Sequence, residues 1–184
     1  MGLTEGGLIV SAVAWSRARP LGSLFAATIA VAVLARYGIG AAGMVAAFTC
    51  ATLVVLSVID IESRRLPNRI VLPAAGMVLF VHLAVAPERW AIWLGAALGA
   101  AGFLLVFALA YPAGLGMGDV KLALLLGAAL GSAVLPALLV GTLAGAAAAV
   151  ALLLRHGGRA RRMTIPFGPF LAFGAIATML LLAP

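Results

Sequence analysis

The chain has 184 residues, of which 65% are hydrophobic and only 9% are charged, and its mean hydropathy is +1.24. A soluble domain carries about 25% charged residues, so this composition predicts an all-α membrane protein, folded as one transmembrane domain over residues 1–184 with no room for a sizeable soluble domain. A β-barrel is not expected, because the apolar runs are continuous rather than alternating.

The net charge of +7 does not indicate a nucleic-acid-binding protein. No basic run is interleaved with aromatic residues, and basic loops beside apolar helices are better explained as topology signals and as contacts to anionic lipid. The one cysteine, Cys50, lies inside an apolar run, which excludes an intramolecular disulfide and a CxxC zinc site. We expect neither a metal nor a cofactor.

Seven apolar segments follow one another along the chain and predict about seven membrane spans, within a range of six to eight. The apolar stretch at residues 8–15 is short and no cleavage site follows it, so a cleavable signal peptide is not expected, although residues 1–15 could add a further span. The fifth segment is too short to cross a bilayer upright, since about 20 residues are needed. The segments are residues 21–37, 39–59, 70–86, 90–111, 120–130, 133–154 and 167–182.

The basic residues predict an orientation. If seven spans are threaded with the N-terminus in the cytoplasm, ten basic residues fall inside and two outside, a strong bias under the positive-inside rule. The predicted site is therefore expected at the cytoplasmic face of the inner membrane. The inside set is Arg17, Arg19, Arg64, Arg65, Arg69, Lys121, Arg155, Arg159, Arg161 and Arg162, and the outside set is Arg36 and Arg89.

The chain has only two aspartates, and each lies at the edge of an apolar segment. Asp60 follows the second segment, and Asp119 stands in the run Gly-Met-Gly-Asp-Val-Lys over residues 116–121. Ionisable groups at membrane depth are costly and are functional candidates by default. Two simpler explanations stay open: Asp60 could be solvated in a cytoplasmic loop, and Asp119 could be the N-cap of the helix it precedes. Gly116 and Gly118 favour an irregular backbone that another chain can approach closely.

The remaining ionisable residues have simple explanations as well. Lys121 could be a snorkelling topology residue, and Glu62 a solvated loop acid or a supporting group. His82 lies about 18 Å along the third segment from its cytoplasmic start, so we expect it to be packed rather than to join Asp60. His156 is expected to be solvated in the basic loop.

Two carboxylates held close together cannot both ionise easily, so they share a proton and titrate as a unit. This arrangement suits peptide hydrolysis, in which one aspartate takes a proton from water and the other protonates the carbonyl oxygen. Two other functions are also compatible with the residues: a small proton-coupled transporter that uses the acids as a relay, and a non-enzymatic subunit of a secretion system.

Three motifs in order resemble the type IV prepilin peptidases. The run Gly116-x-Gly118-Asp119-x-Lys121 is similar to the GxGD motif of that family. Residues 59–62, Ile-Asp-Ile-Glu, followed by Pro67-Asn68, resemble its first-aspartate region, and residues 165–172, Ile-Pro-Phe-Gly-Pro-Phe-Leu-Ala, resemble a further segment after the basic loop. The resemblance runs over roughly residues 49–175.

The resemblance implies an intramembrane aspartyl endopeptidase that removes the basic leader of prepilins or pseudopilins after a glycine, at the cytoplasmic side. It implies that Asp60 and Asp119 are the catalytic pair. Many longer members carry a cysteine-bearing N-terminal region and also methylate the product, so this chain resembles the short form and methylation is not expected. Supporting or substrate-binding roles are implied for Gly116, Gly118, Lys121, Glu62, Pro67, Asn68, Pro166, Gly168 and Pro169.

Overall fold

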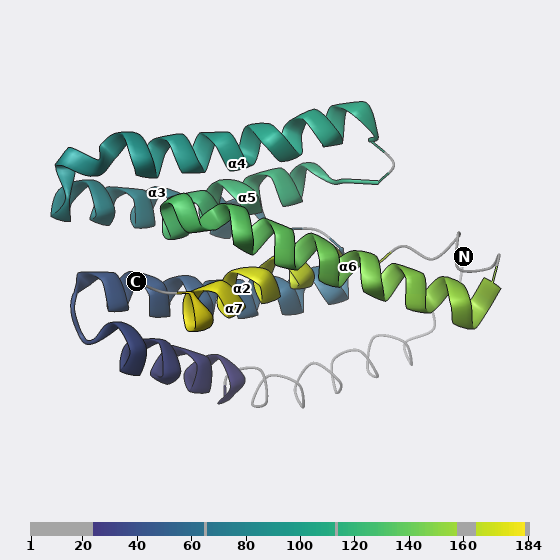
Figure 1. Cartoon of the computed structure of the whole chain (residues 1–184), viewed down its shortest axis with the longest axis horizontal. Coiled ribbons are helices and arrows are strands. Elements are labelled where there is room, and N and C mark those ends of the chain that lie inside the picture. The colour runs from purple at the N-terminus through teal and green to yellow at the C-terminus, as the bar shows by residue number, and fades with distance from the viewer. Residues whose placement is uncertain (1–23, 65, 113, 158–164, 183–184) are drawn as a thin grey trace, which may run out of the picture.

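A computed structural model describes residues 24–64, 66–112, 114–157 and 165–182 (Figure 1). Throughout these ranges the regular elements are helices, and each predicted apolar segment coincides with one. The predicted start of the first segment at residues 21–23, the possible extra span over residues 1–15 and the basic residues 159–162 lie outside the described ranges. The helices are Leu24–Tyr37, α2 (Ala41–Ser63), α3 (Asn68–Val85), α4 (Trp90–Ala110), α5 (Met117–Leu130), α6 (Val134–His156) and α7 (Gly168–Leu181), with short 3₁₀ turns η1 (Pro87–Arg89) and η2 (Gly131–Ala133).

Several of these helices are suited to cross a membrane. Four stretches of the described residues are long and apolar enough: Ala41–Ser63, Asn68–Val85, Pro87–Ala110 and Met117–His156. Leu24–Tyr37 and Gly168–Leu181 are shorter apolar helices. The predicted fifth and sixth segments belong to one 40-residue helical stretch, in which η2 joins α5 to α6. The chain is therefore a multi-pass helical membrane protein, as its composition predicted.

Six of the helices pack as two groups of three, and the helix Leu24–Tyr37 lies against α2 and α7. In one group α5 lies against α3 and α4, and in the other α7 lies against α2 and α6. Glycines allow the closest approaches: a Cβ on Gly127 of α5 would clash with the backbone of Ala96 in α4, and one on Gly174 of α7 would clash with the carbonyl of Ala137 in α6. The abundance of small residues predicted such close helix contacts.

Two predicted boundaries were wrong by about one turn, and both errors concern the aspartates. Helix α2 continues past Asp60 to Ser63. Its C-cap residue, Arg64, has a left-handed φ of 52°, and the Arg64 N–H donates to the Asp60 carbonyl at 2.8 Å. No glycine or proline lies in this last turn. Pro67 disfavours a helical conformation only at the residue that precedes it, so it does not end α2 earlier. Asp60 and Glu62 are thus helical rather than loop residues. Helix α5 begins at Met117, so Asp119 lies in its first turn rather than before it.

Candidate active site

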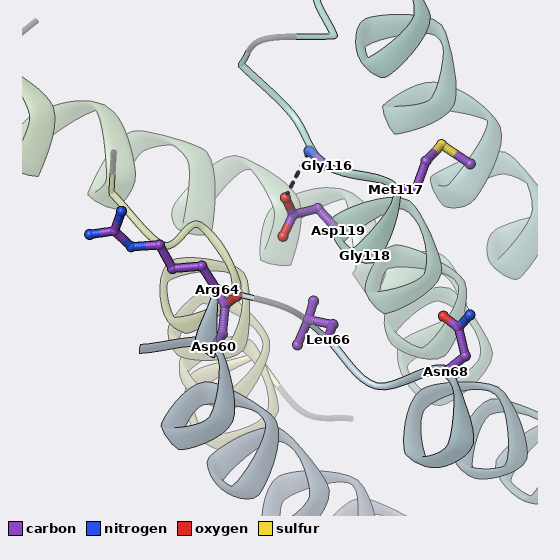
Figure 2. Close-up of a pocket in the computed structure, with 8 residues that line it drawn as sticks. All are labelled: Asp60, Arg64, Leu66, Asn68, Gly116, Met117, Gly118 and Asp119. Carbon is purple, nitrogen blue, oxygen red and sulfur yellow. Dashed lines mark hydrogen bonds between the residues drawn. The ribbon is translucent and has the colours of Figure 1, made fainter. Parts of the chain in front are cut away.

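A cavity of about 340 Å³ lies at the junction of the two helix groups (Figure 2). Its walls come from the end of α2, the connection from α2 to α3, the start of α3 and the start of α5. Both predicted carboxylates, Asp60 from α2 and Asp119 from α5, enter it from separate helices. The lining residues are Asp60, Arg64, Leu66, Asn68, Gly116, Met117, Gly118 and Asp119.

Asp60 is buried, and its carboxylate is held by a distant segment. Only 6% of the residue is exposed, which rules out the solvated loop acid considered above. Its Oδ2 accepts a hydrogen bond of 3.0 Å from the backbone N–H of Gly168, the first residue of α7. A carboxylate near the C-terminal end of its own helix is unfavourable, and the positive N-terminal end of α7 offsets this.

The close contact at Gly168 depends on the absence of a side chain. A Cβ at this position would lie 2.7 Å from Oδ2 of Asp60 and 3.2 Å from its Cγ. The next residue, Pro169, has no N–H, so Gly168 supplies the first backbone donor at the start of α7. The Gly-Pro pair therefore presents one backbone donor to the Asp60 carboxylate.

Asp119 is partly buried and is held by its own helix. Its Oδ2 accepts from the Gly116 N–H at 3.4 Å, and its N–H donates to the Gly116 carbonyl at 3.1 Å (Figure 2). Gly116, not Asp119, is the N-cap residue of α5. The N-cap interpretation of Asp119 is therefore wrong in position, although its carboxylate does bind an amide at the helix start.

The two carboxylates line the same cavity, so like charges on both would repel each other. Figure 2 shows the Asp119 carboxylate directed into the space beside Asp60 and Arg64. A pair of interacting carboxylates exchanges protons as one unit, which is the property that acid–base chemistry requires. Within the described ranges, no group of three or more His, Cys, Asp or Glu side chains gathers that could hold a metal ion.

The walls of the cavity are joined by two further contacts. Gly118 packs against Leu66: a Cβ at Gly118 would lie 3.1 Å from the Leu66 Cβ. Lys121 donates from Nζ to Oδ1 of Asn68 at 2.8 Å, and this bond ties the start of α5 to the start of α3. The interpretation of Lys121 as a snorkelling residue therefore did not include its hydrogen bond to Asn68.

The other predicted residues lie around this cavity or away from it. Glu62 is exposed on α2 and does not line the cavity. Pro67 is the N-cap residue of α3, and Pro166 is partly buried in the segment that leads into α7. His82 is packed as predicted: its Nδ1 lies 3.0 Å from the Ala128 carbonyl oxygen.

Three lining residues were not predicted from the sequence: Arg64, Leu66 and Met117. Arg64 had a usable signal, because it follows Asp60 by four residues, the spacing of neighbours on one helix face. That signal depended on extending α2 past Asp60. Leu66 had no comparable signal, since only the fold brings it to Gly118.

Comparison with known proteins places the chain in a family. The model of the Type IV leader peptidase family matches residues 47–153, which include both aspartates. The chain belongs to this family. A protein of Burkholderia pseudomallei (strain 1026b) named "Prepilin leader peptidase/N-methyltransferase" is 36% identical over 170 residues, covering 87% of this chain and 53% of its own length.

Two more relatives bear the same name. The Xanthomonas campestris pv. campestris protein is 36% identical over 160 residues, covering 83% of this chain and 55% of its own length. The Bacillus subtilis (strain 168) protein is 34% identical over 167 residues, covering 88% of this chain and 65% of its own length. The chain thus spans about half the length of the first of these relatives. No solved structure was found to match it.

Proposed function

We propose that the chain is an intramembrane aspartic endopeptidase that removes the basic leader of prepilin-like or pseudopilin-like precursors. The observation that carries the proposal is that the only two aspartates of the chain enter one cavity from different helix groups. Family membership supports the reaction class, and the relatives' name supports the substrate class. The transporter and the non-enzymatic subunit lack comparable support.

In the proposed mechanism, a water molecule between the two carboxyl groups attacks the scissile carbonyl carbon. Asp60 is the ionised member and takes a proton from the water, while protonated Asp119 gives its proton to the carbonyl oxygen. Collapse of the tetrahedral intermediate breaks the C–N bond. The proton on Asp60 passes to the leaving amine, and the hydroxyl proton of the intermediate returns to Asp119, so the pair regains its starting state.

The assignment of roles follows from the hydrogen bonds. The Gly168 N–H contacts the Asp60 carboxylate at 3.0 Å, whereas the Gly116 N–H contacts the Asp119 carboxylate at the longer distance of 3.4 Å. A donor favours the charged form of a carboxylate, and shorter bonds to charged groups are stronger. Asp60 is therefore assigned as the ionised member of the pair, which can accept the proton of water, and Asp119 as the protonated member, which can donate.

The proposal also assigns roles to residues around the two aspartates. Gly116 leaves part of the cavity wall without a side chain, so an extended peptide can approach Asp119, whereas Gly118 allows Leu66 to pack against α5. The Lys121–Asn68 hydrogen bond holds that wall against α3. The charge bias of the sequence supports a cytoplasmic active site in the inner membrane, and the methylation prediction stays a prediction.

The proposed function is tested with purified wild-type protein in detergent and a synthetic precursor peptide that has a basic leader, a glycine and an apolar segment. Cleavage after the glycine, detected by mass spectrometry, is the expected result. Intact peptide, together with proton-coupled solute uptake by proteoliposomes that contain the protein, would instead support the transporter.

A further inference from the structure

A second cavity, which we call the distal cavity, lies at the opposite end of the helices from the carboxylate cavity. Its volume is about 280 Å³, and it is lined by the start of α2, the end of α3, the start of α4 and the ends of α5 and α7. In Figure 1 this end lies at the left, where α3 joins α4, whereas α5 begins at the right. Ala41, at the start of α2, is roughly 30 Å from Asp60 along the helix, about the thickness of the hydrocarbon core. The two cavities therefore lie near opposite faces of the membrane.

The polar groups of the distal cavity suit an anion. Arg89 supplies an exposed positive charge and Tyr37 a phenol, and the described lining includes no carboxylate, since the neighbouring Glu88 lies outside it. Two further lining residues, Trp93 and Thr178, have buried polar atoms, Nε1 and Oγ1, with no hydrogen-bond partner among the described residues. Buried polar atoms without a partner cost free energy. A cation and such donors without an acid favour an anionic oxygen group over an ammonium.

The Trp93 indole is held in place by two neighbours. The His82 ring stacks on it, with centroids 3.8 Å apart and 9° between the ring planes, and Nδ1 of His82 lies 3.0 Å from the Ala128 carbonyl oxygen. Gly131 also packs against the indole, since a Cβ at this glycine would lie 2.8 Å from Cζ3 of Trp93. A donor that is already oriented loses little freedom when a ligand binds. These contacts give His82, which is far from the aspartates, a role in the distal cavity.

The distal cavity continues into an apolar space between two helices, which we call the α2–α3 groove. This groove has a volume of about 340 Å³, and Ala41 and Val81 line both spaces. From these two residues it runs along both helices toward the middle of the membrane. Its other lining residues are Met44, Val45, Phe48, Met77 and Val78. A polar cavity at a membrane face that leads into an apolar groove matches the headgroup and acyl chain of a lipid.

We propose that the distal cavity and the α2–α3 groove form a binding site for one anionic phospholipid of the membrane. Arg89 binds the phosphate of the headgroup, with Trp93 and Thr178 as further donors, and one acyl chain lies along the groove. The cavity is lined by α2 and α7 of one helix group and by α3, α4 and α5 of the other. The bound lipid therefore joins the two groups at the end opposite the aspartates. The site does not depend on the proposed peptidase reaction.

The test measures binding to delipidated protein in detergent by native mass spectrometry. The probes are phosphatidylglycerol, phosphatidylcholine with the same acyl chains, and glycerol 3-phosphate. One phosphatidylglycerol should bind at least about 10-fold more tightly than phosphatidylcholine, the effect of about one hydrogen bond to a charged group, and glycerol 3-phosphate should not displace it. Equal affinity for the two lipids would overturn the assignment of an anionic headgroup. Displacement by an equal concentration of glycerol 3-phosphate would show a site for free phosphate and would also overturn the proposal.

Two substitutions test the proposed donors. Arg89→Gln removes the charge from an exposed side chain and should lower the affinity for phosphatidylglycerol at least about 10-fold. Thr178→Val keeps the shape of a buried side chain but removes its hydroxyl, so the affinity should fall about 2- to 10-fold. The Tm of the lipid-free Thr178→Val protein should equal or exceed that of wild type, because an unpartnered buried hydroxyl is lost. Wild-type affinity in both variants would place the lipid elsewhere and overturn the inference.

The matched control is Arg155→Gln. Arg155 is an exposed arginine in the last turn of α6 and does not line the distal cavity. Its loss removes the same charge, and the affinity for phosphatidylglycerol should stay at the wild-type value. An equal loss of affinity in Arg89→Gln and Arg155→Gln would indicate attraction by net charge alone, and the inference would be wrong.

Discussion

The two aspartates of the site are held in different ways. Asp119 lies in the first turn of α5, and its carboxylate binds the amide of Gly116, three residues earlier in the same motif. Asp60 lies in the last turn of α2, and its carboxylate binds the amide of Gly168, which is 108 residues later. One carboxylate is thus positioned by local structure, and the other by the packing of α7 against α2.

This difference makes the two groups chemically unequal. The bond to Asp60 is shorter and comes from a helix whose positive end faces the carboxylate, so Asp60 is the group that we assign as the base. It also makes the site dependent on the junction between the two helix groups. A change in α7 can therefore alter the chemistry at a residue of α2 without touching Asp119.

The largest effect outside the carboxylates is predicted for Gly168→Ala. The new Cβ would lie 2.7 Å from Oδ2 of Asp60, so the carboxylate must move, and displacing a catalytic group by about 1 Å can cost about 10²-fold. We expect kcat for a precursor peptide to fall by about that factor, with KM nearly unchanged, in steady-state assays.

The control for this variant is Gly95→Ala, where a Cβ meets nothing within 4 Å. It should retain wild-type kcat. A Gly168→Ala protein with wild-type kcat would show that α7 does not position Asp60, and the comparison between the two aspartates would fail.

A smaller effect is predicted for the Lys121–Asn68 hydrogen bond. Asn68→Leu removes the acceptor, and a lost hydrogen bond of this kind is worth about 0.5–1.5 kcal/mol, or about 2- to 10-fold. We expect kcat/KM to fall within that range because the start of α5, and Asp119 with it, is less firmly held.

Asn68→Asp keeps an acceptor for Lys121 and is expected to retain most of the activity. If the Leu variant matched wild type while the Asp variant was impaired, the bond would have no part in positioning Asp119. Both variants are measured with the same peptide and at equal membrane abundance.

The smallest effect is predicted for Glu62→Gln. Glu62 is exposed and outside the cavity, and surface substitutions usually change stability by less than about 0.5 kcal/mol. Its kcat/KM should stay within about twofold of wild type. A loss as large as that of Gly168→Ala would mean that Glu62, rather than Asp60, faces the substrate.

The sequence allowed the fold class to be predicted, and it placed each aspartate at the edge of an apolar segment. Continuous apolar runs identified the helices. The glycines around Asp119 favoured an irregular backbone, but only Gly116 is non-helical, because α5 already includes Gly118. The contact between Gly168 and Asp60 could not be derived from spacing, because it depends on how α7 packs on α2. The resemblance pointed to Gly168, but not to the atom that it binds.

The boundary errors have a similar cause. A polar residue after an apolar run was interpreted as the end of a helix at Asp60, but α2 continues for another turn and buries that residue. Hydrophobicity indicates where a chain can lie in a membrane, not where its backbone hydrogen bonds stop. Arg64 was missed for this reason, because its place beside Asp60 follows from where α2 ends.

The most direct test of the account is the activity of Asp60→Asn and Asp119→Asn, each co-expressed with a precursor and scored by gel shift for leader removal. Asparagine keeps the shape of either side chain but cannot exchange the proton, so each variant should lose at least about 10²-fold in activity at normal membrane abundance. Normal processing by either variant would contradict the proposal that the two carboxylates act as a pair. If Glu62→Gln were inactive while Asp60→Asn worked, the pair would be Glu62 with Asp119.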